Sequence, residues 1–78
     1  MDKIKTHILR KLYDHTYIGR RHCSVSDMRQ GLPSHERDMK VIEKKVKELI
    51  NEGYLIPQKV GRISINPQKL SDIKEIIH

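Results

Sequence analysis

The chain has 78 residues, enough for one small domain, and its 16 Lys and Arg against 10 Asp and Glu give a formal net charge of +6 at pH 7. Hydrophobic residues make up 36% of the chain and neither Phe nor Trp occurs, so we expect an aliphatic core and no deep substrate pocket. A single Cys excludes an intramolecular disulfide. Together with the lack of a membrane-length apolar run and of a signal peptide, it predicts a cytoplasmic protein that does not enter a membrane.

The first part of the chain is expected to hold two helices and a connection. Apolar residues at steps of four predict a helix over residues 2–13. Residues 14–24 show no helical period and are expected to connect that helix to the next. Ser26 is the expected cap of a short second helix over residues 27–30, and Gly31 is expected to end it.

A long amphipathic helix is predicted over residues 34–52, with Ser34 as its cap and Gly53 at its end. Five apolar side chains fall within about one third of its circumference: Met39, Ile42, Val46, Leu49 and Ile50. The opposite stripe is largely cationic: Arg37, Lys40, Val41, Lys44, Glu48 and Asn51, with Lys45 and Lys47 at its edges. A short helix, a turn with glycine and a long helix are the layout of a helix-turn-helix, here about residues 26–52.

Beyond the long helix the hydrophobic period changes to two. This period predicts strands over residues 54–58 and 63–65, joined by a tight hairpin tip at 59–62. Pro67 suits the first position of a helix, so a last helix is predicted over about residues 67–77.

Basic residues are concentrated where the helix-turn-helix is predicted. Residues 19–47 carry eight basic and four acidic side chains, whereas residues 1–18 carry four and two, and residues 48–78 carry four and four. An excess of positive charge in one part of the chain is typical of a surface that faces a polyanion.

The order helix, helix, helix, hairpin, helix resembles the winged helix-turn-helix DNA-binding superfamily, and in particular its small bacterial and archaeal regulators. The most specific match is in residues 46–56, where two apolar positions separated by two polar ones are followed by Gly53 and two further apolar residues. The resemblance implies an α+β fold in a single domain over residues 1–78. That fold has a three-helix core, a small antiparallel β-hairpin wing at about residues 54–66, and a C-terminal helix.

In DNA-binding members of that superfamily the third helix enters the major groove and the wing contacts the DNA backbone or the minor groove. Carried over by position, the groove-facing candidates are Ser34, Arg37, Lys40, Val41 and Lys44. Arg37 suits a bidentate pair with guanine, and Val41 suits contact with a thymine methyl group or is an ordinary exposed residue. Phosphate contacts are expected from Lys44 and from six further side chains: Lys47, Arg29, Arg20, Arg21, Lys59 and Arg62.

A solvated surface is the alternative for these cations. Lys40 and Lys44 are spaced to form ion pairs with Glu36 and Glu48, which would leave the face without a binding role. The arginine pair at residues 20–21 is short enough to be part of an ordinary exposed loop.

Metal binding and catalysis find little support in the sequence. His15, His22 and Cys23 could supply three ligands, but adjacent residues are not at a chelating spacing, and Cys23 is expected to be buried instead. His35 is expected on the core side of the long helix. No phosphate-binding glycine loop or nucleophile with a spaced base occurs, so neither an enzyme nor a cofactor is predicted.

The expected function is binding of double-stranded DNA as a transcription regulator, with helix 34–52 as the recognition helix. The alternatives are a protein–protein interaction module in a larger complex, since fold alone does not decide function, and an RNA-binding module. The last helix, with Ile73, Ile76 and Ile77, is the candidate surface for a homodimer. The alternative is packing against the first helix, which is favoured for Leu70 and Ile73 more than for Ile76.

Overall fold

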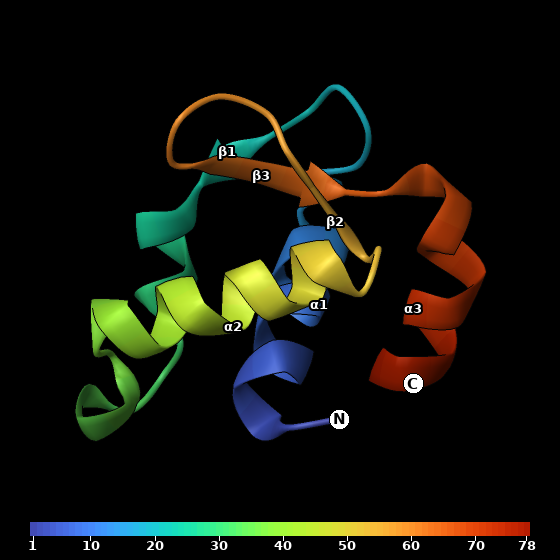
Figure 1. The fold of residues 1–78 in the computed structure, drawn as a ribbon. Coiled ribbons are helices and arrows are strands. Elements are labelled where there is room, and N and C mark those ends of the chain that lie inside the picture. Colours follow the sequence, from blue (N-terminus) through green and yellow to red (C-terminus); the bar gives the residue numbers. More distant parts are fainter.

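The computed structural model describes residues 1–78 and has an α+β fold, in which three α-helices pack with one antiparallel sheet. The helices are α1 (Lys3–Asp14), α2 (Met39–Asn51) and α3 (Leu70–Ile77). The strands are β1 (Cys23–Ser24), β2 (Leu55–Pro57) and β3 (Arg62–Ile65), in the order β1-β3-β2. Three 3-10 helices connect them: η1 (Val25–Arg29), η2 (Ser34–Glu36) and η3 (Pro67–Lys69). In Figure 1, α2 crosses in front of α1, the sheet lies above both, and α3 stands beside them.

Helix α1 begins at Asp2, whose carboxylate Oδ1 accepts a hydrogen bond from the Lys5 amide at 2.8 Å. This bond satisfies one of the free amides of the first turn. Ile8, Leu9 and Leu12 are buried along one side of α1. The predicted bounds of 2–13 are therefore confirmed to within one residue.

The predicted second helix is the 3-10 helix η1, and its predicted cap is wrong. Ser24 caps it, because the Ser24 Oγ accepts a hydrogen bond from the Ser26 amide at 3.3 Å. The Val25 amide donates to the Gly61 carbonyl at 2.8 Å, which ties the preceding residues into the sheet and fixes where the turn can start. Met28 anchors η1 in the core.

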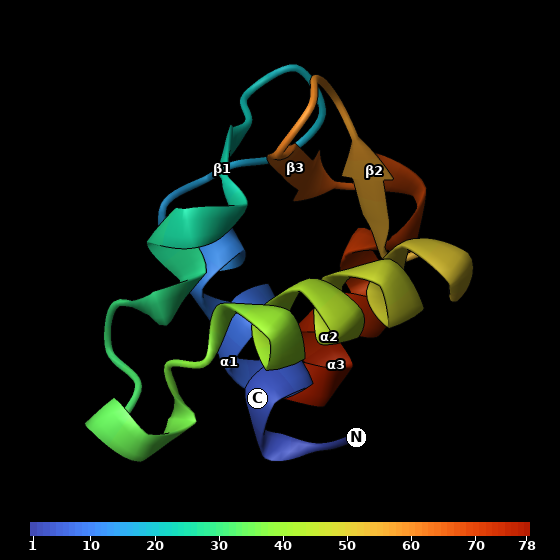
Figure 2. The ribbon, with the colours of Figure 1, turned by 60° about the vertical axis from the view of Figure 1, so that its left-hand side comes forward.

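The single helix predicted over residues 34–52 is also wrong, because the chain divides into η2 and α2. Ser34 begins η2, and α2 is capped by Asp38, whose Oδ1 accepts a hydrogen bond from the Lys40 amide at 2.9 Å. Asp is as good a cap as Ser, so a second start signal within the stretch ends the first turn and begins a new helix. The Arg37 Nε donates to the Leu32 carbonyl at 2.8 Å and holds the intervening turn. Figure 2 shows the turn of η2 set apart from the start of α2.

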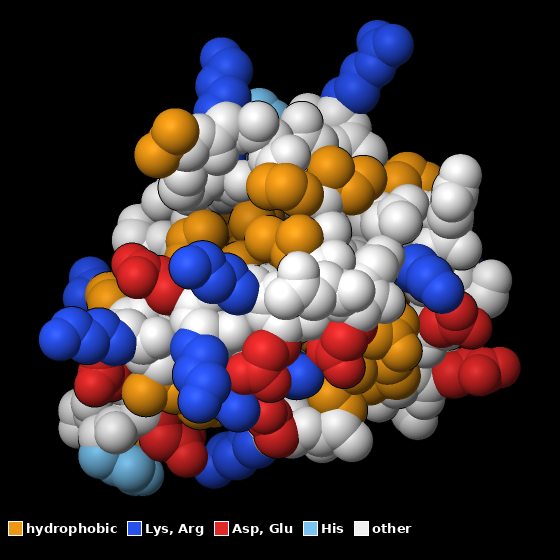
Figure 3. All heavy atoms as spheres, viewed as in Figure 1, with side chains coloured by type: hydrophobic (Ala, Val, Ile, Leu, Met, Phe, Trp, Pro, Cys, Tyr) orange, Lys and Arg blue, Asp and Glu red, His pale blue; other side chains and the backbone are white.

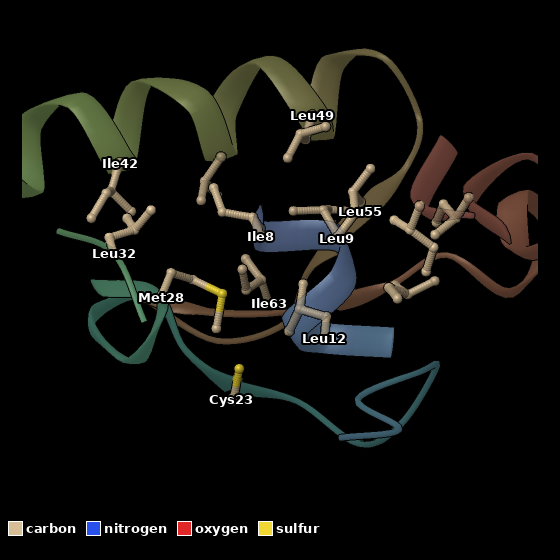
Figure 4. Packing of buried hydrophobic residues seen from close by; sticks show 14 residues of the cluster. Ile8, Leu9, Leu12, Cys23, Met28, Leu32, Ile42, Leu49, Leu55 and Ile63 are labelled. Atoms are coloured by element: carbon tan, nitrogen blue, oxygen red, sulfur yellow. The ribbon is translucent and has the colours of Figure 1, made fainter. Parts of the chain in front are cut away.

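The core is one cluster of buried side chains drawn from the helices and the sheet. Figure 4 shows Ile8 and Leu9 of α1 between Leu49 of α2 and Ile63 of β3. The apolar stripe predicted for α2 is confirmed in that its most buried members, which include Ile42, face this cluster. Each fully buried Leu or Ile contributes about 1.5–3 kcal/mol by removal from water, so the cluster dominates the stability of the fold.

The β2–β3 hairpin is confirmed, and Leu55 pairs with Ile65 in its register. The expected connection at residues 14–24, however, contains β1 and pairs with β3. Buried Ser64 of β3 fixes this loop, since its Oγ donates to the Gly19 carbonyl at 2.8 Å and accepts from the Gln58 Nε2 at 2.9 Å. A two-residue strand has no detectable alternation, so the sequence could not predict it.

Helix α3 packs against α1. Ile73 and Ile77 are buried in the core, and an Arg10 guanidinium nitrogen donates to the Ile77 carbonyl at 3.0 Å. Ile76 is only half-buried. None of the helices combines the length and the apolar character needed to cross a bilayer.

Candidate nucleic-acid interface

Three lysines lie along the outward face of α2, and we call Lys40, Lys44 and Lys47 the lysine stripe. Spacings of four and three residues place them on one side of the helix, and all three are exposed. None of them lies within ion-pairing distance of a carboxylate. Figure 3 shows basic side chains standing along α2 on this face. The lysine stripe is therefore a row of free cations.

Glu36 and Glu48, the acids considered as partners of the lysine stripe, are engaged with α1, whereas Glu43 is exposed on the outward side of α2. The Lys3 Nζ lies 3.4 Å from the Glu36 Oε1, and the Lys5 Nζ lies 3.1 Å from the Glu48 Oε1 and 2.8 Å from the Glu52 Oε1. Hydrogen bonding to Glu52, and then to Glu48, raises the pKa of Lys5. The ion pairs of Lys40 and Lys44 with Glu36 and Glu48, considered as the alternative, do not form.

Lys45 belongs to this paired side and not to the cationic face. Its Nζ lies 2.9 Å from the Asp2 Oδ2 and 4.0 Å from the Glu48 Oε2, and the hydrogen bond to Asp2 raises the pKa of Lys45. Partial burial acts to raise the pKa of the Asp2 carboxyl, but the hydrogen bonds from the Lys5 amide and from Lys45 outweigh it and lower that pKa. At 100° per residue Lys45 is only about 40° from Leu49 on the helix, a signal that could have placed it beside the core.

The segment before α2 holds the other groove-facing candidates. Ser34 and Arg37 are exposed but precede the helix, and the Arg37 guanidinium is anchored by its bond to the Leu32 carbonyl. Arg29 and Arg37 line the same hollow, beside η1, so the structure brings these two cations together. His35, expected on the core side, is exposed because it lies in η2 and not on α2.

Val41 is 38% exposed, on the flank of α2 between the lysine stripe and the side that faces α1. It makes no contribution to the buried core cluster.

The β2–β3 hairpin and α2 enclose an open groove of about 630 Å³, which no pattern in the sequence predicts. Lys47, Lys59 and Arg62 all line it, so the fold brings one stripe lysine next to the two hairpin cations. Lys59 is exposed. Arg62 belongs to β3 and not to the hairpin tip, and its Nε donates to the His22 Nδ1 at 2.7 Å. That bond requires His22 to carry no proton on Nδ1.

Arg20 and Arg21 stay apart from this groove. Both are exposed, and the Arg21 guanidinium lies 5.8 Å from the centroid of the Tyr17 ring.

His22 and Cys23 were the candidates for a metal or nucleophile site. Nowhere do three His, Cys, Asp or Glu side chains gather closely enough to hold a metal ion. Cys23 is 2% exposed, as predicted, and burial, followed by the charge of Asp27, raises the pKa of its thiol. A raised pKa leaves little of the reactive thiolate.

Comparison of the chain with protein-family models, with curated proteins and with solved structures finds no match. The function is therefore inferred from the side chains described above.

Proposed function

We propose that the protein binds double-stranded DNA through the outward face of α2 and acts as a transcription regulator of the winged helix-turn-helix type. The observation that carries this proposal is the lysine stripe, whose three ammonium groups are exposed and free of carboxylate partners. Release of condensed counterions makes such free cations favourable partners for phosphate groups.

The arrangement of elements supports the same proposal. η1 and the turn at Gly31 precede α2 as in a helix-turn-helix, with the short η2 inserted before α2, and the β2–β3 hairpin lies beside α2 in the place of a wing. The recognition helix is narrowed to Met39–Asn51, about 20 Å long at 1.5 Å per residue, which suffices to cross a major groove about 12 Å wide.

The candidate contacts fall into four groups under this proposal. Lys40, Val41 and Lys44 remain groove-facing, and Ser34 and Arg37 take positions on the approach to α2. Lys47, Arg29, Lys59 and Arg62 are assigned to phosphates. Arg20 and Arg21 are the weakest members of the set, because no hollow joins them to α2.

A protein–protein interaction module is the second candidate, and the exposed apolar side chains of Val41 and Val60 favour it. RNA binding is less well supported, because the lysine stripe carries no aromatic side chain on which an unpaired base could stack.

Ile73 and Ile77 are buried within the chain, so Ile76 is the one residue of the three on which the proposed homodimer through α3 still rests. A cytoplasmic location is proposed from the single free cysteine.

Chemical-shift mapping during titration with random-sequence duplex DNA, at two salt concentrations, tests the proposal. We expect chemical-shift changes on residues 39–47 and 59–62 that weaken as salt rises. The logarithm of the binding constant should fall with the logarithm of the salt concentration, with a slope of about −0.9 for each phosphate contacted.

Lys40→Glu combined with Lys44→Glu should abolish duplex binding and leave the melting temperature nearly unchanged. Lys74→Glu on α3, another exposed lysine without an ion pair, is the control for a charge reversal outside this face and should bind like the parent. Binding that survives the double reversal would rule out this face.

A further inference from the structure

The groove between α2 and the β2–β3 hairpin has the size of a small-molecule site. Its volume of about 630 Å³ lies within the range of roughly 300–1,000 Å³ that is usual for ligand pockets. Figure 3 shows it as an apolar surface directly above α2, between the helix and the hairpin.

The groove is apolar over much of its lining. Val46 and Ile63 form part of its wall as members of the core cluster, and Ile50 is half-buried beside them. On the hairpin side, Pro57 is exposed and Val60 is wholly exposed. Val60 contributes nothing to the core, so the fold leaves an apolar side chain at the groove without a partner of its own.

The charges around the groove favour an anion. Lys47 and Lys59 are exposed and have no carboxylate partner, and Glu43 is the single acid of the lining. The Nε and one terminal nitrogen of Arg62 donate hydrogen bonds to His22. The N–H groups of the other terminal nitrogen remain free to donate to a ligand. Three cations against one carboxylate give the site a positive potential.

We propose that this groove binds a small amphiphilic anion, with an aromatic or aliphatic body lying against Val46, Ile50 and Val60 and one carboxylate or sulfonate group facing Lys47 and Lys59. Apolar burial supplies the affinity, and the cations fix which end of the ligand points outward. The site shares Lys47, Lys59 and Arg62 with the proposed phosphate contacts. Its tests use no nucleic acid, so a failure of this proposal and a failure of the proposed DNA binding are distinguishable.

Titration with anilinonaphthalene sulfonate, an apolar fluorophore with one anionic group, tests the site. We expect saturable binding of one molecule per chain, amide shifts on residues 46–50 and 57–63, and a rise in melting temperature, since a ligand of the native state stabilises it. Shifts elsewhere, or fluorescence that accompanies a fall in melting temperature, would overturn the proposal.

Two exposed valines supply a matched pair of variants. Val60→Asp should weaken binding of the probe by about tenfold or more, because the substitution removes apolar surface and adds a negative charge that repels the anionic group. Val41→Asp places the same change on α2 outside the groove and should leave the affinity unchanged. Equal effects of the two substitutions would contradict the site.

The charge preference is tested with phenylbutyrate and phenylbutylamine, which share one apolar body and differ in the sign of the charged group. Phenylbutyrate should bind more tightly by about tenfold, and Lys47→Glu combined with Lys59→Glu should reverse the order. Equal affinity of the two compounds for the parent protein would refute the anionic part of the proposal.

Discussion

The two flanks of α2 carry the same kind of residue in different electrostatic surroundings. On the flank that faces α1, Lys45 contacts Asp2 and Glu48, and Lys5 of α1 contacts Glu48 and Glu52. On the outward flank no member of the lysine stripe has a carboxylate partner. Net charge along the sequence therefore says less about a binding face than the positions of the acids. Here Lys5 of α1 holds Glu48 and Glu52 on one side, and Glu43 is the one acid of α2 beside the lysine stripe.

The difference concerns binding more than stability. Exposed ion pairs contribute only about 0–1 kcal/mol each, whereas a buried aliphatic side chain contributes about 1.5–3 kcal/mol. The buried side of α2 thus stabilises the fold, and its two exposed sides are free to differ in function.

Removing a side chain from the buried side should have the largest effect. Ile42→Ala is expected to lower the free energy of unfolding by about 2–5 kcal/mol, a large fraction of the total for so small a domain, because it opens a cavity beneath α2. Urea denaturation measures the change. Ile42→Val, which removes one methylene, should cost about 0.5–1.5 kcal/mol, and an equal cost for both substitutions would mean that this side is not close-packed.

The adjacent lysines 44 and 45 separate the two flanks directly. Lys44→Ala should weaken duplex DNA binding by about 3–10-fold and reduce the salt slope by about 1, with little change in melting temperature. Lys45→Ala should leave duplex affinity nearly unchanged and lower the melting temperature by a few degrees at most, because it breaks the contact with Asp2. Fluorescence anisotropy and thermal unfolding give the two readouts. The opposite pattern would show that the binding face lies on the flank that faces α1.

Acidification should remove the contribution of the paired flank. Since the pKa of Asp2 is lowered in the folded state, its stabilising effect is present above the unfolded value of about 3.9 and is lost as pH falls through the lower folded value. Asp2→Asn keeps a good helix cap but removes the charge, so it should destabilise by at most about 1 kcal/mol at neutral pH.

The gap in unfolding free energy between parent and Asp2→Asn should therefore close below about pH 4. Denaturation series at several pH values measure it. A gap that is constant from pH 7 to pH 3 would show that the carboxylate charge plays no part.

The smallest effect is expected at Val41. Val41→Ala should change the free energy of unfolding by less than about 0.5 kcal/mol, because the side chain is exposed and lies outside the core cluster. If it contacts a thymine methyl group, the substitution should reduce the preference for thymine at one position in a binding-site selection. An unchanged preference would remove Val41 from the base-reading set.

Much of the fold could be predicted because the strong patterns are local. The apolar stripe of α2, the hairpin and α1 follow from periodicities that a few neighbouring residues set. The break before α2 could not be predicted from such patterns, because Ser34 and Asp38 are both good caps and the bond from Arg37 to the Leu32 carbonyl holds the turn between them. β1 was missed because its two residues pair with β3, nearly forty positions later.

The candidate site was predictable in its lysines but not in its neighbours. Lys40, Lys44 and Lys47 follow from the helical spacing alone. The neighbours depend on contacts between distant segments, which no local pattern encodes. These contacts are the pairing of Lys45 with Asp2, the pairing of Arg62 with His22, and the groove beside Val60.

β3, the middle strand of the sheet, is the last of the three strands to leave the ribosome. Because β1 and β2 each pair only with β3, a nascent chain that has not yet emerged beyond residue 61 holds two strands with unsatisfied edges and no sheet. Emergence of the four residues of β3 should therefore convert an open, aggregation-prone intermediate into a complete sheet in one late cooperative step, after which α3 adds Ile73 and Ile77 to the core.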